Sequence, residues 1–245
     1  MPRPGSGLSQ TRLDTCALLV ARHPVGEADL IVRFFTESSG MVPVIARNAR
    51  RSTKRFGALE PMHLLRVRID SSPVRDLGTL TEARLERPRL GLTTRLGPME
   101  AAGRALRWLR RAAPLRSAEP SLWHEVNGLL DRLDTPAAAE AGATEALLAA
   151  SGLRLLAATG WGLELERCVR CGKPCPERSR AILDVAAGGI VCRECGGRGD
   201  VLGSSERLAM VDVMTNAAMA LTVGGARALD LVDRALEIHG RGEAT

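Results

Sequence analysis

The sequence predicts an α+β protein: an N-terminal five-stranded OB-type β-barrel, followed by an α-helical bundle that carries an inserted four-cysteine zinc-ribbon module. Three observations predict this fold. Five short runs of strand-forming residues lie within residues 16–85, separated by turn residues. From Pro98 onwards, apolar residues recur at helical spacing. Two Cys-x-x-Cys pairs interrupt the helical half, at a spacing typical of a zinc ribbon.

The predicted organisation has five segments: residues 1–14 form a flexible N-terminal arm, 15–87 the OB-fold domain, 88–167 the first part of the helical domain, 168–200 the zinc-ribbon module, and 201–245 the second part of the helical domain. The arm is expected because Met1 to Asp14 is rich in Pro, Gly and Ser. The composition, 45% hydrophobic and 25% charged, is ordinary for a globular protein.

The expected location is the cytoplasm, in association with the nucleoid. Met1 to Asp14 contains no apolar core of the kind found in signal peptides. The longest apolar run, Ala146 to Leu163, is interrupted by Arg154 and several glycines, so no membrane span is expected. Cysteines at metal spacing then indicate a reducing compartment.

The strands of the barrel are expected at Cys16–Ala21, Asp29–Thr36, Met41–Ala46, Pro61–Ile69 and Leu77–Leu85. Ser38-Ser39-Gly40 supplies one of the turns. Closure into a barrel is how such a short sheet avoids open edges. An SH3-like barrel is an alternative that strand count does not separate from an OB-fold. The usual OB helix between strands three and four has little room between Arg47 and Pro61.

Helices are expected at Pro98–Ala113, Ser121–Leu133, Thr144–Thr159, Ser204–Thr222 and Ala226–His239. Thr144 is the expected N-cap of the third helix, and Gly160 the left-handed residue that ends it. The third helix leads directly to the first cysteine pair, so the ribbon is an insertion between helices.

The cysteines predict a single structural Zn²⁺ bound by Cys168, Cys171, Cys192 and Cys195. Residues 181–185 and 190–192 flank a Gly-Gly turn and predict a hairpin between the pairs. Cys175 lies close by, so pairing of Cys171 with Cys175 is an alternative for the first ligand pair. Two disulfides are a second alternative.

Charge is divided unevenly along the chain. Residues 1–116 contain 21 Lys and Arg against 10 Asp and Glu, a net charge of +11, whereas residues 117–245 contain 13 against 18, a net charge of −5. A basic front half favours a polyanionic partner. Because 32 of the 34 basic residues are Arg, genomic bias is the alternative explanation of the Arg content, although it does not account for the segregation.

The strongest candidate for phosphate contact is the basic loop that leaves the third strand. It contains no acidic residue, and its five cations repel one another unless phosphates screen them. A solvated flexible loop is the alternative. A stripe of arginines on the first long helix is a weaker candidate, because exposed helices commonly carry Arg. The predicted DNA-contacting residues are Arg47, Arg50, Arg51, Lys54, Arg55, Arg104, Arg107 and Arg111.

Aromatic residues are few: three Phe, three Trp and no Tyr. Proteins that grip the bases of single strands use several aromatic platforms. The sequence therefore predicts binding mainly through the nucleic-acid backbone, which leaves base edges free to pair.

Catalysis is not expected. The four histidines are scattered, and the sequence contains no His-Glu-x-x-His pair and no Walker-type glycine loop. A catalytic zinc needs an open coordination position, whereas four thiolates close the shell.

Five stretches together resemble the RecO family, the recombination mediators of the RecFOR pathway. Residues 25–31 resemble the family's Gly-Glu-x-Asp turn, residues 40–51 its third strand and the basic residues that follow, and residues 77–83 its fifth strand. Residues 153–172 resemble the helix that enters the zinc module, and residues 187–195 the second half of that module. The likeness extends in the same order from about residue 13 to residue 240.

The resemblance implies an OB-fold, a helical bundle and a four-cysteine zinc module. It implies binding of single- and double-stranded DNA in the repair of DNA damage and in recombination. It also implies annealing of strands coated by single-stranded DNA-binding protein, and action with RecR to load RecA. Two rival hypotheses stay open: a zinc-ribbon enzyme that processes nucleic acid, and a protein adaptor that works through its acidic helical half.

Overall fold

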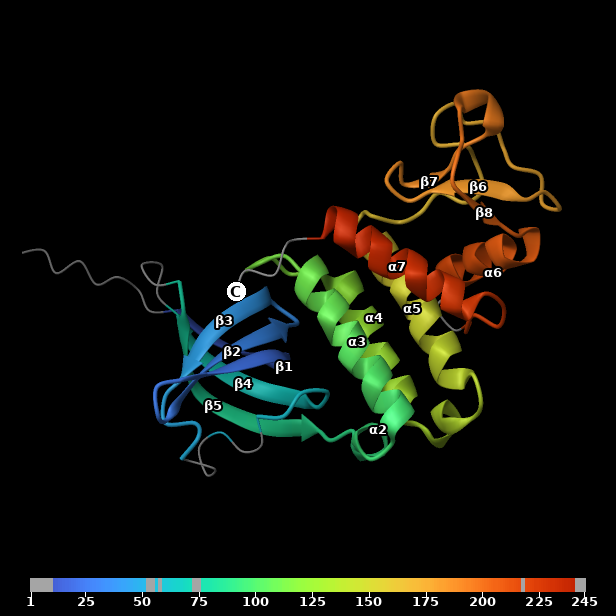
Figure 1. The fold of residues 1–245 in the computed structure, drawn as a ribbon. Helices are drawn as coiled ribbons and strands as arrows, with labels where there is room; N and C mark the ends of the chain where they lie inside the picture. Colours follow the sequence, from blue (N-terminus) through green and yellow to red (C-terminus); the bar gives the residue numbers. More distant parts are fainter. Residues whose placement is uncertain (1–10, 52–55, 57–58, 72–75, 217–218, 241–245) are drawn as a thin grey trace, which may run out of the picture. The chain divides into compact units, whose positions relative to one another are not determined.

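The computed structural model describes residues 11–51, 56, 59–71, 76–216 and 219–240 (Figure 1). The chain forms two compact units. The first comprises residues 1–89 and 113–123, and the second comprises residues 90–112 and 124–245. The predicted α+β class is confirmed, with strands in the first unit and helices with a small cysteine-bearing sheet in the second.

The first unit is a closed barrel with strand order β1-β2-β3-β5-β4. Its strands are β1 (Thr11–Val25), β2 (Asp29–Thr36), β3 (Gly40–Ala46), β4 (Leu64–Ser71) and β5 (Gly78–Arg87). All neighbours are antiparallel except β3 and β5, which close the barrel in parallel through the pairs Val44–Gly78 and Ile45–Thr79. This order is that of the predicted OB-type barrel.

The barrel core follows the alternation of side chains along each strand. Inward residues such as Val32, Phe34 and Val44 are fully buried. Phe56 has helical conformation and joins the same core from the link between β3 and β4. β1 is longer than predicted: Thr11 to Asp14, expected in the arm, pair with β4 as regular strand.

One part of the barrel unit comes from a distant stretch of sequence, residues 113–123. The backbone N–H of Met41 donates to Pro114 O at 3.1 Å, and the N–H of Arg116 donates to Met41 O at 3.0 Å. Gly40 has φ +61°, and a Cβ there would lie 1.9 Å from Ser117 O, so only glycine permits this approach. The added segment covers the barrel next to β3.

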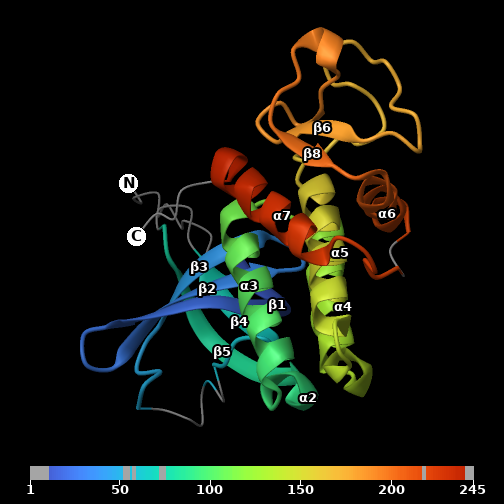
Figure 2. The same ribbon diagram turned by 45° about the vertical axis from the view of Figure 1, so that its right-hand side comes forward.

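The second unit is built around α5 (Ala143–Ala158), which packs against α3 (Leu96–Ala112), α6 (Ser204–Thr215) and α7 (Gly225–His239). Nine consecutive residues of α5, Leu148 to Leu156, are buried. A helix that is apolar on all sides is expected at the centre of a bundle. Both ribbon views show α7 beside α5 (Figures 1 and 2). The remaining elements are α2 (Leu90–Thr93), α4 (Pro120–Asp134) and a short 3₁₀ turn, η1 (Pro136–Ala139).

A buried ion network joins α4 to α5. The carboxylate of Glu125 accepts hydrogen bonds from Arg154 Nε at 2.9 Å, from Arg132 Nη2 at 3.3 Å and from the hydroxyl of Ser151. Arg154 also donates to Val213 O at 3.1 Å and to Met219 O at 3.3 Å. The network therefore ties both helices to α6, through Val213, and to the chain that follows it, through Met219.

Two helix boundaries differ from the prediction. Thr144 is not the N-cap of α5, because Gly142 takes that position and the Thr144 hydroxyl donates to Ala138 O at 2.6 Å. α6 ends at Thr215 rather than at Thr222. Beyond it, the N–H of Leu221 donates to Ala146 O, a tertiary contact that draws the chain away from a helical path. Gly160 has φ +80°, as predicted for the residue that ends α5.

The cysteine module contains a three-stranded sheet in the order β7-β6-β8. The hairpin of β6 (Ala181–Asp184) and β7 (Gly189–Ile190) was predicted, whereas β8 (Asp200–Leu202) was not. Within the described residues, no helix has the length and apolar character needed to cross a membrane.

Candidate functional site

The outer face of β2 and β3 is the part of the barrel that combines apolar and basic side chains. Because Val32, Phe34 and Val44 point inward, alternation places Ile31 and Arg33 of β2 on the outside. Pro43 and Ile45 of β3 pair with Arg33 and Ile31, and all four are only half-buried. In OB-folds this face of strands two and three is where oligonucleotides bind.

The basic loop begins at the end of this face and is anchored on the β1–β2 turn. The N–H of Asn48 donates to Asp29 Oδ1 at 2.8 Å, and the N–H of Arg50 donates to Ala28 O at 3.0 Å. Asn48 has φ +56°, a left-handed conformation that Asn tolerates better than most residues. The Gly-Glu-x-Asp turn thus fixes the path of the basic loop.

The three described arginines of this loop are exposed. Arg50 Nη1 donates to Glu27 O at 3.2 Å and to Gly26 O at 3.4 Å. Arg51 pairs with Glu27 at 3.0 Å, but the two side chains are 66% and 90% exposed, so the pair contributes little. Arg47 has no hydrogen-bond or ion-pair partner within the described residues. Lys54 and Arg55 lie outside the described residues.

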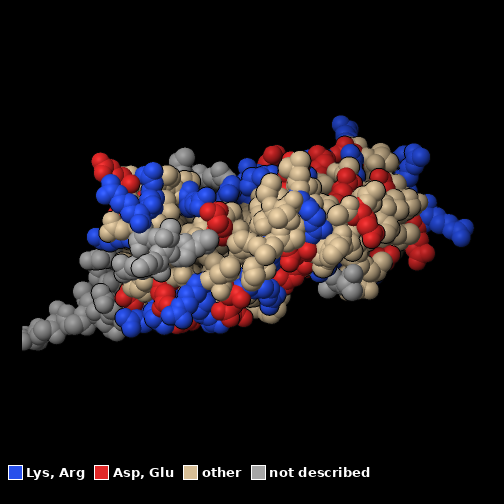
Figure 3. Space-filling model, turned by 90° about the horizontal axis from the view of Figure 1, so that it is seen from below, with Lys and Arg blue, Asp and Glu red and all other residues tan. Residues whose placement is uncertain are grey.

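The outer face of β1, β4 and β5 is different, because its charges neutralise one another. Arg68 lies 2.7 Å from Glu82 and 3.2 Å from Asp14, and Arg12 lies 2.9 Å from Asp70. Basic and acidic side chains are intermixed over the surface that Figure 3 shows. Such a face offers no uncompensated positive field for phosphates.

The predicted arginine stripe on α3 is divided. Arg104 donates to Asp233 of α7 at 2.5 Å and to Leu229 O at 3.3 Å, and it lies over the ring of Trp108 at 5.4 Å. Its guanidinium is occupied in holding α3 to α7, which argues against DNA contact. Arg107 is exposed and Arg111 half-buried, and both are without partners in the described part of the chain.

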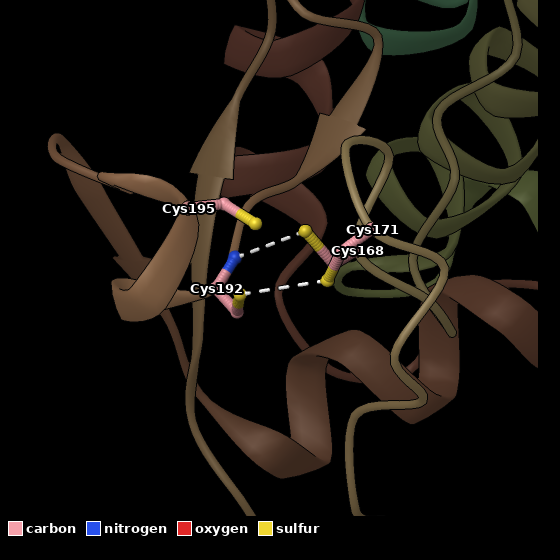
Figure 4. A group of neighbouring side chains, drawn as sticks. All are labelled: Cys168, Cys171, Cys192 and Cys195. Carbon is pink, nitrogen blue, oxygen red and sulfur yellow. Dashed lines mark hydrogen bonds between the residues drawn. The ribbon is translucent and has the colours of Figure 1, made fainter.

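The four predicted cysteines meet in the second unit (Figure 4). Their sulfurs all lie within 4.8 Å of one another. Cys168 and Cys171 come from one loop, and Cys192 and Cys195 from another. Each loop is followed by a glycine in the left-handed region, Gly172 at φ +72° and Gly196 at φ +79°. A residue with a side chain would be strained there, so the two Cys-x-x-Cys-Gly turns are local consequences of the sequence.

Electrostatics within the cluster favour a bound cation. The N–H of Cys192 donates to Cys168 Sγ at 3.3 Å, which lowers the pKa of Cys168 to about 6. The pKa of Cys195 is raised to about 12, chiefly by hydrogen bonding with Cys192 and then with Cys171. The sulfurs therefore do not all ionise together at neutral pH unless a cation compensates their charge.

The spacing of the sulfurs fits a tetrahedral metal shell. A Zn–S bond of about 2.3 Å implies sulfurs about 3.8 Å apart. Cys171 Sγ and Cys192 Sγ are 3.8 Å apart. Cys175 is outside the cluster; its sulfur contacts Pro176 O at 3.8 Å. The geometry thus favours the set with Cys168 and Cys171 over the pairing of Cys171 with Cys175.

A buried arginine, Arg207 of α6, holds the first cysteine loop in place. Its side chain is 1% exposed. Nη1 donates to Leu165 O at 3.0 Å, and Nη2 donates to Pro176 O at 2.9 Å and Glu177 O at 3.1 Å. No sequence motif indicates this clamp, because all of its acceptors are backbone carbonyls.

Sequence reasoning also missed the outer face of β2 and β3 as part of the site. A signal was present, since Ile31, Arg33, Pro43 and Ile45 occupy alternate positions in two strands that were both predicted. These strands were used to predict a barrel, but which of their side chains face outward was not considered.

Comparisons with known proteins agree along the chain. Residues 11–89 match the family described as Recombination protein O N terminal, and residues 101–239 match Recombination protein O C terminal. A DNA repair protein RecO from Syntrophotalea carbinolica is 33% identical over 180 residues, which are 73% of this chain and 67% of that protein.

Proposed function

The chain belongs to the RecO family of DNA repair and recombination proteins, and on that premise we propose that it is a non-enzymatic recombination mediator. In this proposal it binds single- and double-stranded DNA and anneals complementary strands coated by single-stranded DNA-binding protein. With RecR, it then helps to load RecA. Family membership supports the role in repair and recombination, and the barrel surface supports the mode of DNA contact.

The observation that carries the proposal is the exposed, weakly paired arginines at the end of the β2–β3 face. Arg47 and Arg51 lose little when they meet phosphates, since Arg47 has no partner in the described residues and Arg51 has only an exposed one. Arg50 is held by two carbonyl oxygens, which orient its guanidinium. Contacts of this kind position a DNA backbone without reading its sequence.

Annealing needs no bond chemistry. Cations that neutralise phosphates reduce the repulsion between two strands as they approach. The adjacent face presents Ile31 and Ile45 rather than aromatic platforms, so bases are not held by stacking. Their edges stay free to search for a complementary partner.

We propose Zn²⁺ as the ion of the cysteine cluster, bound by Cys168, Cys171, Cys192 and Cys195 in a structural role. Four thiolate ligands complete a tetrahedral shell, and the ion would contribute folding energy to a module with a very small core. The expected stoichiometry is one zinc per chain by elemental analysis, and the Cys192→Ser chain should lose it.

The DNA-contact proposal is tested with a matched pair of double variants. Arg47→Gln with Arg51→Gln should lower the slope of log affinity against log salt by about 1.4 for single strands, or about 0.7 per lost contact. Arg12→Gln with Arg84→Gln removes equal charge from the neutralised face and should change the slope much less. Equal effects of the two pairs would reject the basic loop as the contact site.

The mediator role is tested by annealing of complementary strands coated with single-stranded DNA-binding protein, with and without RecR. Annealing should depend on Arg47 and Arg51 and leave the strands chemically intact. Cleavage or joining of DNA that is lost with Cys192→Ser would instead favour a zinc-dependent enzyme. Partner binding through the acidic helices without any effect on DNA would favour an adaptor.

A further inference from the structure

The cysteine module contains a groove of about 400 Å³ that is lined in part by Cys168 and Cys192 of the sulfur cluster. Ile182, Ile190 and Val201 supply an aliphatic floor, and Lys173, Arg180 and Arg193 lie around it. Val201 is 55% exposed, although it is apolar. The volume lies within the range of sites that bind small organic groups.

The module differs in charge from the rest of the acidic half of the chain. Residues 168–200 contain six Lys and Arg against four Asp and Glu, a net charge of +2, whereas the remainder of residues 117–245 carries −7. Four thiolates around a divalent ion would add −2 and leave the module neutral overall. Any positive field in the module is therefore local and depends on which cations lie beside the groove.

The charges around the groove are not all neutralised. Lys173 pairs with Glu194 at 3.1 Å. Arg180 and Arg193 are exposed, and neither side chain has a hydrogen-bond or ion-pair partner within the described ranges. Two free guanidinium groups beside an aliphatic floor suit a ligand that combines a planar apolar group with two anionic groups.

We propose that this groove is a second contact for single-stranded DNA, which takes one unstacked base on its floor and the flanking phosphates on Arg180 and Arg193. This inference rests on the proposed function, because it assumes that the chain binds DNA. When the barrel already holds a DNA strand, the rest of that strand is present at high effective concentration near the groove, so even a weak second contact raises the overall affinity. Duplex DNA keeps its bases stacked, so the groove should not engage it in this way.

The test compares two double variants of the full chain on an oligothymidylate of about 12 nucleotides, a length that one OB-fold can cover, and on one about three times longer. Arg180→Gln with Arg193→Gln removes the groove charges. Arg167→Gln with Arg198→Gln removes two exposed charges of the same module that do not line the groove. Zinc content is measured for each chain to show that the module is intact.

The groove variant should bind the longer oligothymidylate about tenfold more weakly, with a salt slope lower by about 1.4. The control variant should change affinity by less than about twofold. Val201→Asn should weaken single-strand binding and leave duplex binding unchanged. A 4-thiothymidine strand should form photocrosslinks to residues of the groove.

Several results would overturn the inference. Equal losses in the two double variants would show diffuse attraction rather than a site. Equal losses on single strands and duplex would remove the base contact. Binding of an acidic peptide that depends on Arg180 and Arg193, with single-strand affinity unchanged, would make the groove a protein-docking site. If the unaltered chain bound no DNA, the proposed function itself would fail, and that result is distinct from all three.

Discussion

Arginines of the two compact units illustrate two opposite uses of this side chain. In the helical unit, Arg104, Arg154 and Arg207 donate hydrogen bonds to carboxylates or backbone carbonyls of the same unit. In the barrel unit, Arg47 and Arg51 are exposed; within the described residues Arg47 has no partner, and Arg51 has only an exposed one. A count of arginines therefore does not locate a DNA-binding surface; burial and internal partners do.

The largest expected effect removes the charge that neutralises the buried arginines. Glu125→Gln leaves Arg132 and Arg154 without their carboxylate, which should lower the free energy of unfolding by about 3–5 kcal/mol. Denaturant unfolding measures it, and Glu140→Gln, at an exposed position, is the control. A loss below about 1 kcal/mol would contradict the comparison, because Arg132 and Arg154 would then not depend on their internal carboxylate.

The next effect concerns the clamp on the cysteine loop. Arg207→Met removes the side-chain donor from three carbonyl oxygens, of which Pro176 O keeps the N–H of Ser179, and should cost about 2–3 kcal/mol. Hydrogen exchange should accelerate over residues 165–177, while duplex binding stays unchanged. Arg178→Met, an exposed neighbour, should be close to neutral. Weakened duplex binding in Arg207→Met would show that a buried arginine also serves DNA contact.

A comparison within one helix sharpens the point. Arg104→Gln should cost about 1–2 kcal/mol of stability, because it removes the ion pair with Asp233 and leaves the Trp108–Asp233 hydrogen bond as the remaining polar link of this site between α3 and α7. Arg107→Gln should cost less than about 0.5 kcal/mol. We expect only Arg107→Gln to alter the salt dependence of DNA binding. If Arg104→Gln altered the salt dependence and Arg107→Gln lowered the stability, the proposed difference between these two arginines of α3 would be contradicted.

The smallest effect depends on pH. Arg234, and then Arg227, hold the pKa of Asp200 below its ordinary value, which ties β8 to α7. The stabilisation is present above the pKa of the unfolded carboxyl, about 3.9, and is lost as pH falls through the lower folded pKa. Because Asp200 is 36% exposed, we expect at most about 0.5 kcal/mol. Asp200→Asn should remove this part of the fall in the free energy of unfolding at acidic pH. If the free energy of unfolding falls with pH in the same way in both chains, the prediction is contradicted.

Much of this arrangement follows from local sequence. Runs of strand-forming residues between turns located all five barrel strands, helical spacing located α3, and two Cys-x-x-Cys pairs located the sulfur cluster. These signals are local because the physical causes are local: side-chain period, turn conformation and ligand spacing.

The remaining features depend on contacts between distant residues. Nothing near Arg207 indicates that its acceptors are carbonyls of residues 165–177, and nothing near Arg104 indicates its partner Asp233, which lies 129 residues further along the chain. β8 has only three residues, too few for a periodic signal. The groove in the cysteine module was missed because its lining comes from separate segments between Cys168 and Val201, which only the folded module brings together.

The return of residues 113–117 to the barrel has a consequence for how the protein is divided. Pro114 and Leu115 run beside Met41 and form a short parallel bridge with β3, and Trp123 packs against Phe35 with tilted rings whose centroids are 5.7 Å apart. A fragment ending at Arg89 would leave Met41 with unpaired backbone groups and Phe35 uncovered. The smallest fragment that retains the whole barrel runs past Trp123 and so carries α3 as an internal excursion. A truncation, a domain exchange or a proteolytic cut should therefore leave the barrel intact when it falls after Trp123, and should destabilise the barrel when it falls at the end of β5.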